Sequence, residues 1–334
     1  MDFALDETQR AIGRLARDAL VRESDVDAAW KALGQAGLLS LAIPERLDGD
    51  GLGVSEVAVL LAEVGRAAAA LPALSTLALG VLPVVRCGTA AQQDELLVGV
   101  ATGDRLLTAA LRGSVSSVSS GDGLSGKVVG VGYAAQAYRI LVPAGDRVFL
   151  VDPASDGVSL TRTGTSGGAP EFTVVLDGVA AEALGGAGAA VELHRLAVAG
   201  ACAYGDGLVA GALDLTAAHV RTREQFGKPL ATFQAVAQQI ADVYIRARTL
   251  HLAASSACWR LGAGLDADAD LDVAAYWLAE ESLPALHTCH HLHGGLGVDA
   301  SYALHRYYSA VKDLVRLLGG VEHRLGRLGA RIAG

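Results

Sequence analysis

The sequence predicts a multi-domain α+β protein in which a β-rich middle segment separates two helical segments. Apolar residues recur at helical spacing before Gly103 and again after Gly188, whereas the chain between them is rich in Val, Ser, Thr and Gly. A length of 334 residues fits two or three domains. We therefore expect an N-terminal helical domain (1–104), a middle antiparallel β-domain (105–185) and a C-terminal helical domain arranged as a four-helix bundle (186–334).

Expected helices cover residues 6–23, 25–35, 55–70, 191–222, 232–262, 270–292 and 301–332. Ser55 stands where the third of them needs an N-cap. The best candidate for a membrane span is the apolar run 71–85, which Pro72 and Pro83 interrupt. Because a membrane helix needs about 20 consecutive apolar residues, we expect this run in the core and no membrane span.

Expected strands cover residues 106–111, 126–131, 138–142, 147–151, 158–162 and 172–176. Turn signals separate them, among them Ser120-Gly121-Asp122-Gly123. Gly130 begins a G-x-G-x-x-A pattern, and Asp152 follows about 20 residues later, as in a dinucleotide fingerprint. The next strand begins only about five residues after this turn, which leaves no room for a crossover helix. A dinucleotide site is therefore not predicted here.

Composition and charge exclude several classes of protein. Hydrophobic residues make up 51% of the chain and charged residues 19%, which is too little polar material for a disordered protein. The net charge of −9 disfavours binding to nucleic acid. Four widely spaced cysteines, without a C-x-x-C pair, and an N-terminus without a signal-peptide pattern fit a reduced, cytoplasmic protein.

Alternating aspartates precede the third C-terminal helix. Asp266, Asp268, Asp270 and Asp272 are spaced as in a calcium loop, but Leu271 stands where such a loop needs glycine. We expect a solvated loop whose last aspartates cap the helix that follows.

A cluster of four histidines and one cysteine lies in residues 287–295, HTCHHLHGG. These side chains could bind zinc, but on a helix only His287 shares a face with His290 or His291, and the sequence has no second ligand cluster. We therefore expect no metal site. The Gly294-Gly295 pair ends the helix and would let a ligand approach the backbone closely.

The segment 221–229, RTREQFGKP, lies between two long helices, and Phe233-Gln234 opens the second of them. Basic side chains, exposed amide donors and a helix N-terminus converge here, which suits a phosphate or pyrophosphate. By itself the segment is equally compatible with a simple helix–helix turn that carries surface arginines.

Taken together, these segments resemble the acyl-CoA dehydrogenase family. REQFGKPLATFQ (223–234) and HLHGGLG (291–297) resemble its C-terminal domain, and GLL (37–39), IPER (43–46) and EVGR (63–66) resemble its N-terminal domain. The resemblance covers essentially the whole chain. It implies the family's helical–β–helical fold, FAD as cofactor, an acyl-CoA substrate and, by analogy, an electron-transferring flavoprotein as partner.

The chain departs from the family where the flavin ring and the base are expected. The family's T-E-P-x-A-G-S-D segment is replaced by residues 108–115 and its W-[IS]-T strand by residues 128–131, in a β-domain that looks shortened. The catalytic Glu of the family's Y-E-G-T motif falls on Leu318. Some members carry the base before an Arg on an earlier helix; here that residue is His194, to which we assign a structural role.

In tetrameric members, the retained segments contact the FAD that a neighbouring subunit mainly binds. The candidate cofactor-binding residues are Arg223, Gln225, Phe226, Phe233, Gln234, His291 in place of the family's Gln, Gly294 and Gly295. The resemblance thus implies a subunit without a base in an α2β2 enzyme, similar to those that dehydrogenate steroid side-chain CoA esters in cholesterol-type catabolism, with a partner supplying the Glu. Two alternatives stay open: an autonomous enzyme using His194 or Glu322, and a scaffold subunit without a cofactor role.

Overall fold

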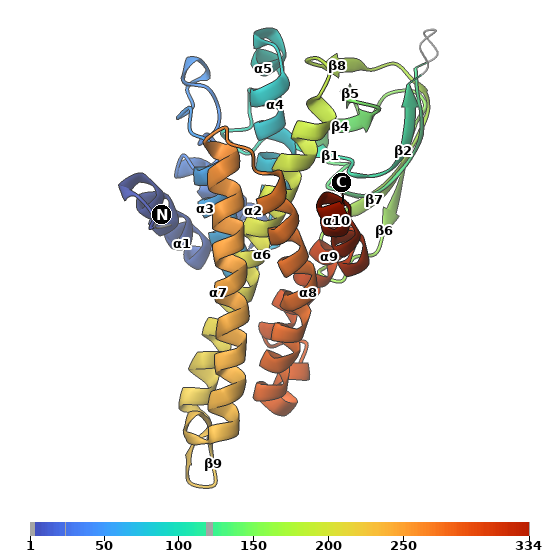
Figure 1. Cartoon of the computed structure of the whole chain (residues 1–334). Helices are drawn as coiled ribbons and strands as arrows, with labels where there is room; N and C mark the ends of the chain where they lie inside the picture. Colours follow the sequence, from blue (N-terminus) through green and yellow to red (C-terminus); the bar gives the residue numbers. More distant parts are fainter. Residues whose placement is uncertain (1–3, 24, 118–122, 334) are drawn as a thin grey trace. The chain divides into compact units, whose positions relative to one another are not determined.

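A computed structural model describes residues 4–23, 25–117 and 123–333 (Figure 1). The chain forms two compact units. The mixed unit contains Leu5–Leu60 and Ala70–Gly200, and the helical unit contains Met1–Ala4, Leu61–Ala69 and Ala201–Gly334. Helices, sheets and helices follow one another along the chain, which confirms the predicted α+β fold class. The turn expected at residues 120–123 lies largely outside the described residues.

The mixed unit begins with short helices that side chains cap. Their bounds are α1 (Glu7–Arg22), α2 (Val26–Gln35), η1 (Glu45–Leu47), α3 (Val54–Arg66, shared with the helical unit), η2 (Leu74–Val81), α4 (Leu82–Cys87) and α5 (Ala90–Leu97). Asp6 and Thr89 form capping boxes at the starts of α1 and α5. The N-cap expected at Ser55 is wrong: α3 begins one residue earlier, and the Glu56 carboxylate accepts a hydrogen bond from the Gly53 N–H at 3.0 Å.

The apolar run at residues 71–85 lies in the core, as predicted. It forms the π-helix η2 and the start of α4, and every residue from Ser75 to Val84 is buried. The run packs on the first strand of the sheet region. A Cβ at Gly80 would lie 2.3 Å from the Leu107 Cβ, so only glycine permits this approach.

Two four-stranded sheets form the middle of the chain, in the orders β1-β4-β5-β8 and β2-β3-β7-β6. The strands are β1 (Leu106–Ala109), β2 (Arg112–Ser117), β3 (Leu124–Gly132), β4 (Ala137–Ala144), β5 (Arg147–Val151), β6 (Val158–Thr163), β7 (Glu171–Val179) and β8 (Glu182–Leu184). β1 pairs with β4 in parallel, so the expected purely antiparallel arrangement is wrong for this pair. The strand expected over 106–111 ends at Ala109, and neither β2 nor β8 was predicted.

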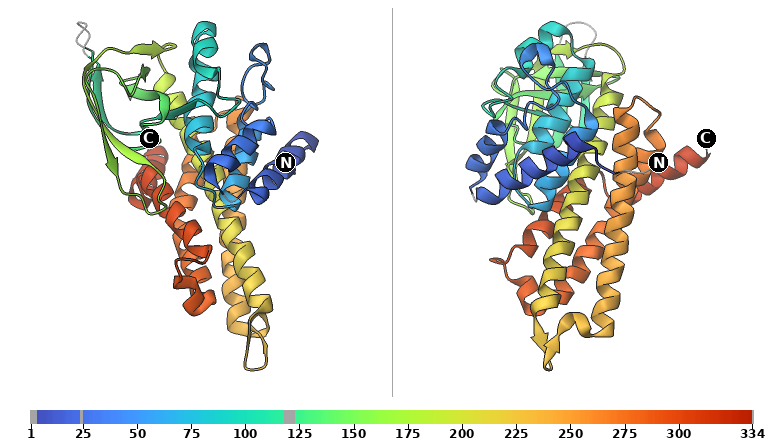
Figure 2. Two further views of the ribbon diagram at one scale, coloured as in Figure 1. Left: turned by 180° about the vertical axis from the view of Figure 1, so that it is seen from behind. Right: turned by 90° about the vertical axis from the view of Figure 1, so that its left-hand side faces the viewer.

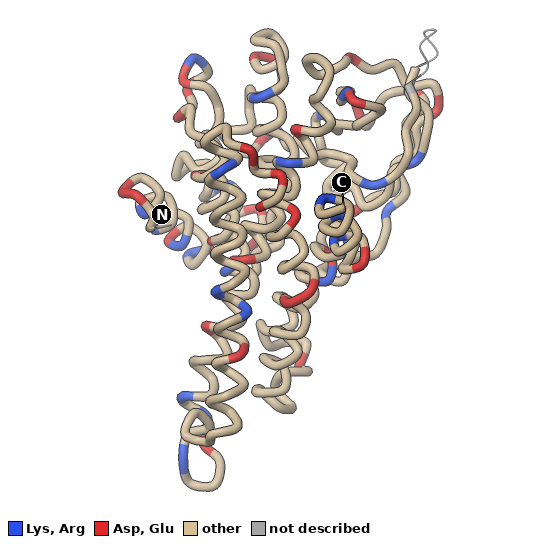
Figure 3. The backbone as a smooth tube through the Cα atoms, in the orientation of Figure 1, with Lys and Arg blue, Asp and Glu red and all other residues tan. Residues whose placement is uncertain are grey.

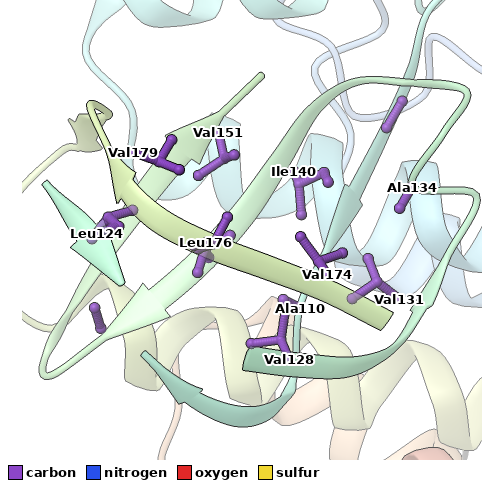
Figure 4. Packing of buried hydrophobic residues seen from close by; sticks show 13 residues of the cluster. Ala110, Leu124, Val128, Val131, Ala134, Ile140, Val151, Val174, Leu176 and Val179 are labelled. Atoms are coloured by element: carbon purple, nitrogen blue, oxygen red, sulfur yellow. The ribbon is translucent and has the colours of Figure 1, made fainter. Parts of the chain in front are cut away.

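Apolar side chains from both sheets form one cluster (Figure 4). Val128 and Val174 come from β3 and β7 of one sheet, and Ile140 and Val151 come from β4 and β5 of the other. The G-x-G-x-x-A pattern lies at the end of β3 and in the turn that leads directly into β4. The two strands are joined by a short turn, as expected, without the crossover helix that follows the glycines in a dinucleotide fingerprint.

The helical unit is built from long helices. Its elements are α6 (Ala189–Thr222, which starts in the mixed unit), β9 (Glu224–Gln225), β10 (Lys228–Pro229), η3 (Leu230–Thr232), α7 (Gln234–Gly262), α8 (Asp268–His293), η4 (Gly294–Val298), α9 (Leu304–Leu317) and α10 (Val321–Ala333). α6 and α7 run side by side to the β9–β10 hairpin (Figure 2). The single helix expected over 301–332 is wrong, because Gly319 and Gly320, with φ of 93° and 84°, separate α9 from α10.

α6, rather than the run at 71–85, is the described helix that has the length and composition of a membrane span. Its most apolar window is 78% buried inside the protein. The core helix of a soluble protein passes the same test of length and hydropathy, so this test alone does not assign a membrane span.

α3 and α6 approach each other closely along three glycines, Gly65, Gly207 and Gly211, which we call the glycine seam. A Cβ at Gly207 would lie 1.9 Å from the carbonyl oxygen of Ala62. Cβ atoms at Gly65 and Gly211 would lie 2.2 and 2.3 Å from carbonyl oxygens of the facing helix. The end of α3 therefore belongs to the same packed unit as the C-terminal helices.

Asp266 lies in the exposed turn before α8, as expected, and its carboxylate accepts a hydrogen bond from the Asp268 N–H at 3.2 Å, but Asp272 departs from the expectation. α8 begins at Asp268, and the side chain of Asp272 inside it is only 5% exposed. Its carboxylate accepts hydrogen bonds from the Nε atoms of Arg327 and Arg331, at 2.9 and 3.1 Å. Asp272 thus connects α8 to α10. The sequence prediction failed because both partners lie far along the chain.

Candidate functional site

The segment predicted to hold a phosphate forms a hairpin at the end of the α6–α7 pair. β9 and β10 pair antiparallel, and Phe226 and Gly227 turn the chain with φ of 53° and 77°. Lys and Arg residues lie at this tip (Figure 3). Arg223 is exposed, and no ion pair recorded among the described residues engages its guanidinium. Its charge is therefore available to a ligand.

Aromatic and amide side chains surround this arginine on the same segment. The Phe226 ring is 92% exposed and meets the Phe233 ring edge-on, with centroids 6.1 Å apart. The Lys228 Nζ lies 4.4 Å from the centroid of Phe233. Gln225 and Gln234 are exposed. The segment thus presents cations, an aromatic face and neutral amides, a combination that suits a nucleotide phosphate and base.

The second predicted segment is a glycine turn at the end of α8. Gly294 has φ of 59° and ψ of −135°, a conformation that side chains disfavour. A Cβ added at Gly294 or Gly295 would meet no atom within 4 Å, so the space beside both is open. His291 is exposed in the last turn before them. This backbone can therefore be approached by a large ligand.

A pair of histidines brings the two segments together. The rings of His219, one turn before Arg223 on α6, and His293, the last residue of α8, are stacked with centroids 4.3 Å apart. Burial lowers the pKa of His219, and the Arg223 charge lowers it further. Burial is also the main cause that lowers the pKa of His293, and His219 and His290 add to it. In both rings the neutral form is therefore favoured.

His287 and His290 of the cluster contact Tyr308 of α9. The His287 Nε2 lies 2.8 Å from the Tyr308 hydroxyl oxygen, and the His290 ring meets the Tyr308 ring edge-on at 5.3 Å. His290 Nδ1 lies 2.6 Å from the carbonyl oxygen of Gly297 and so donates a hydrogen bond to the glycine turn. Among the described residues, no group of three or more His, Cys, Asp or Glu side chains could hold a metal ion.

A buried leucine lies at the position where the resemblance places the family's base. Leu318 follows α9 and is 4% exposed. Its carbonyl accepts a hydrogen bond from the Nε of Arg324 at 2.7 Å, and Arg324 itself is 2% exposed. Glu322 is exposed on the first turn of α10. His194 is half-buried on the part of α6 that lies in the mixed unit.

Residues 108–115 and 128–131, which the resemblance aligns with the family's flavin-ring contacts, include side chains that pack in the core. Thr108 is fully buried, and its hydroxyl donates a hydrogen bond to the carbonyl oxygen of Gly132 at 2.8 Å. Val128 lies in the cluster between the sheets, and Val129 is 38% exposed. Neither valine side chain can donate a hydrogen bond or stack on the flavin as an aromatic ring would.

Sequence analysis missed His219, Tyr302 and Arg324. His219 precedes Arg223 by one helical turn, and this spacing was a signal that the two share a face. The Tyr302 ring lies 5.3 Å from that of His293. Arg324 carried no recognisable signal, because its role depends on the break between α9 and α10.

Comparison with known families decides the identity. The N-terminal domain of acyl-CoA dehydrogenases matches residues 2–104, and the C-terminal domain of the same enzymes matches residues 179–333. Together the two matches cover more than half of the chain. The chain belongs to the acyl-CoA dehydrogenase family. It is 50% identical to the acyl-CoA dehydrogenase FadE28 of Mycobacterium tuberculosis over 341 aligned positions, which cover 99% of each protein.

Solved acyl-CoA dehydrogenase complexes have the same fold. The chain is similar to a chain of the ChsE4-ChsE5 complex from Mycobacterium tuberculosis, with a TM-score of 0.93 and 34% identity over 100% of this chain and 99% of that one. It is also similar to a chain of the Tcur3481-Tcur3483 steroid acyl-CoA dehydrogenase, with a TM-score of 0.91 and 35% identity over 98% of each. A structure of PigA with FAD shares the fold at 20% identity.

Proposed function

We propose that this chain is the subunit without a base in a heteromeric, FAD-dependent acyl-CoA dehydrogenase. It completes a FAD site carried mainly by a partner subunit, which supplies the catalytic Glu in an α2β2 assembly. The observation that carries the proposal is a contrast within the helical unit. The two segments suited to a dinucleotide are exposed and open, whereas the position of the base holds the buried Leu318.

The residues present fit the pyrophosphate and adenosine end of FAD. The Arg223 guanidinium can donate two parallel hydrogen bonds to phosphate oxygens, and Gln225 and Gln234 can donate further ones. The open space beside Gly294 and Gly295 admits the ligand next to the backbone. His291 offers a ring nitrogen where the family has an amide.

The chemistry divides between the two subunits. Bound FAD supplies the hydride acceptor for α,β-dehydrogenation of an acyl-CoA thioester, and the partner's carboxylate removes the α-proton. This chain orients the cofactor by holding the pyrophosphate and adenosine end of FAD, and it contributes no base. The likeness to a steroid acyl-CoA dehydrogenase supports a steroid side-chain CoA ester as substrate. We place the protein in the cytoplasm and, by family analogy, expect an electron-transferring flavoprotein as the oxidant.

The first test is expression of the chain alone and together with the product of a neighbouring gene. Alone, it should be colourless and prone to associate, because α7 exposes Tyr244, Ile245 and Leu252 by 58%, 60% and 41%. Co-expressed, it should be soluble and yellow. Gel filtration with flavin absorbance measures both states. A stable yellow homotetramer of the single chain that oxidises acyl-CoA would contradict the proposal and support an autonomous enzyme.

A second test places a carboxylate at the position of the base. Leu318→Glu should not give the isolated chain activity, because no flavin ring is held opposite and positioning contributes about 7–11 kcal/mol to such reactions. The buried Arg324 guanidinium nearby would also lower the pKa of the new carboxyl and weaken it as a base. Leu318→Gln is the uncharged control. Dye reduction with acyl-CoA is the assay, and turnover by the isolated Leu318→Glu chain would show an intact ring pocket.

A further inference from the structure

The stack of His219 and His293 links the two segments of the proposed FAD site directly. The Arg223 N–H donates a hydrogen bond to the His219 carbonyl oxygen at 2.8 Å, so the ring of His219 and the Arg223 segment belong to one helical end. Gly294 follows His293 without an intervening residue. The two imidazole planes differ by only 21°. Each half of the site is thus attached to one ring of the pair.

The hydrogen bond of His293 determines which of its ring nitrogens carries the proton. Its Nδ1 lies 2.8 Å from the carbonyl oxygen of Cys289, so Nδ1 carries the proton and donates it. Its Nε2 is buried and has no hydrogen-bond partner among the described residues. His293 is 5% exposed, whereas His219 is half-buried. A proton added at Nε2 of His293 would therefore create a buried cation with no acceptor.

We propose that His219 and His293 are a positioning pair, which in its neutral form holds the Arg223 segment against the Gly294-Gly295 turn and so sets the grip on FAD. This inference rests on the proposed function. Two flat neutral rings stack favourably, whereas two imidazolium ions at the same separation repel each other. Protonation should therefore separate the two segments and weaken FAD binding.

The groups that surround the pair favour its neutral form. Arg223 faces His219 from the end of α6, and His290 faces His293 from one turn earlier on α8. The Tyr302 ring packs against His293 from the segment before α9, where Asp299 also lies, and His305 follows in the first turn of α9. Arg223 opposes a positive charge on His219, and His290 acts in the same direction on His293. Among the described residues, no carboxylate is recorded as hydrogen-bonded or ion-paired to either ring of the pair.

The sign of the pH dependence follows from these lowered pKa values. A histidine with a pKa lowered in the folded protein stabilises the native arrangement above its ordinary value of about 6.5. That stabilisation is lost progressively as the pH falls from this value through the lowered one. FAD binding should therefore be constant above about pH 7 and should weaken below about pH 6.

The experiment uses the co-purified complex and titrates its apo-form with FAD, by flavin fluorescence, between pH 5 and pH 8. The wild-type complex should lose affinity several-fold between pH 7.5 and pH 5.5, because the rings are neutral at the higher pH and protonation at the lower pH separates them. In the double variant His219→Phe/His293→Phe, flat rings remain but cannot be charged, so affinity should stay high and independent of pH. His219→Ala, which leaves the buried ring of His293 in place, should bind FAD weakly at every pH.

His287→Phe is the matched control, because His287 lies on the same helix but faces Tyr308. It should keep the wild-type pH profile. A double Phe variant with the wild-type profile, or a His219→Ala complex with undiminished affinity, would overturn the inference. If Arg223→Ala nevertheless lowers FAD binding, the proposed function stands and only the role of the pair fails. If Arg223→Ala has no effect either, the proposed function itself fails.

Discussion

Replacement of Arg223 by alanine should leave the hetero-oligomer assembled and strip or weaken its FAD. An arginine hydrogen bond to phosphate contributes about 1.5–3 kcal/mol, so flavin affinity should fall roughly ten- to a hundredfold. Arg223→Lys should recover part of this loss, since a point charge cannot reproduce the paired donors of a guanidinium. The measurements are flavin absorbance per complex after gel filtration and a FAD titration of the apo-complex.

Two further variants make this result specific. Gln234→Ala should act in the same direction but more weakly, because a neutral hydrogen bond contributes about 1 kcal/mol. Arg221→Ala removes an exposed arginine of the same helical end and should change FAD content little. Unchanged FAD content and full turnover in the Arg223→Ala complex would mean that the hairpin is only a connection between helices. The chain would then be a scaffold subunit.

The second large effect concerns stability. Asp272→Ala should destabilise the complex by about 1.5–3 kcal/mol, because it removes a buried carboxylate that accepts charge-assisted hydrogen bonds from Arg327 and Arg331. Urea or thermal unfolding of wild-type and variant complexes measures this. Asp270→Ala is the control: its carboxylate pairs with Arg260, at a site where both side chains are partly exposed, and its loss should cost less than 1 kcal/mol.

The effect of Asp272 should depend on pH in one direction. Burial would raise the pKa of this carboxyl, but hydrogen bonds from Arg327 and Arg331 outweigh burial and lower it. A carboxyl with a lowered pKa stabilises the folded state above its ordinary value of about 3.9, and this contribution disappears as the pH falls through the lowered value. The stability difference between wild type and Asp272→Ala should thus be constant near neutral pH and shrink only in strong acid.

Helices with long periodic patterns were the elements that the sequence predicted well. α6 and α7 begin and end within two residues of expectation, because apolar spacing and the polar segment between them mark both ends. β8 was missed because its three residues are too few to show alternation. The parallel pairing of β1 with β4 could not be foreseen either, since register depends on partners elsewhere in the chain.

The candidate site shows the same contrast between local patterns, which were predicted, and long-range contacts, which were not. Arg223 and Gly294 were identified from local patterns, and the structure leaves both exposed. The contact that brings their segments together, between His219 and His293, is invisible in sequence because it joins two helices through packing. Asp272 was misread for the same reason. Residues with a local sequence pattern can thus be identified from the sequence, whereas contacts between distant segments can be identified only from the structure.

The glycine seam has a practical consequence for anyone who wishes to cut this protein into parts. A fragment that starts at α6 would lack residues 61–66 of α3 and would leave the backbone of Gly207 and Gly211 uncovered in water. Larger residues cannot be introduced at Gly207 or Gly211 to cover this surface, because in the intact protein they would clash with carbonyl oxygens of α3. Expression of the C-terminal helices as an independent module therefore calls for a design that carries the end of α3 with them, for example by circular permutation.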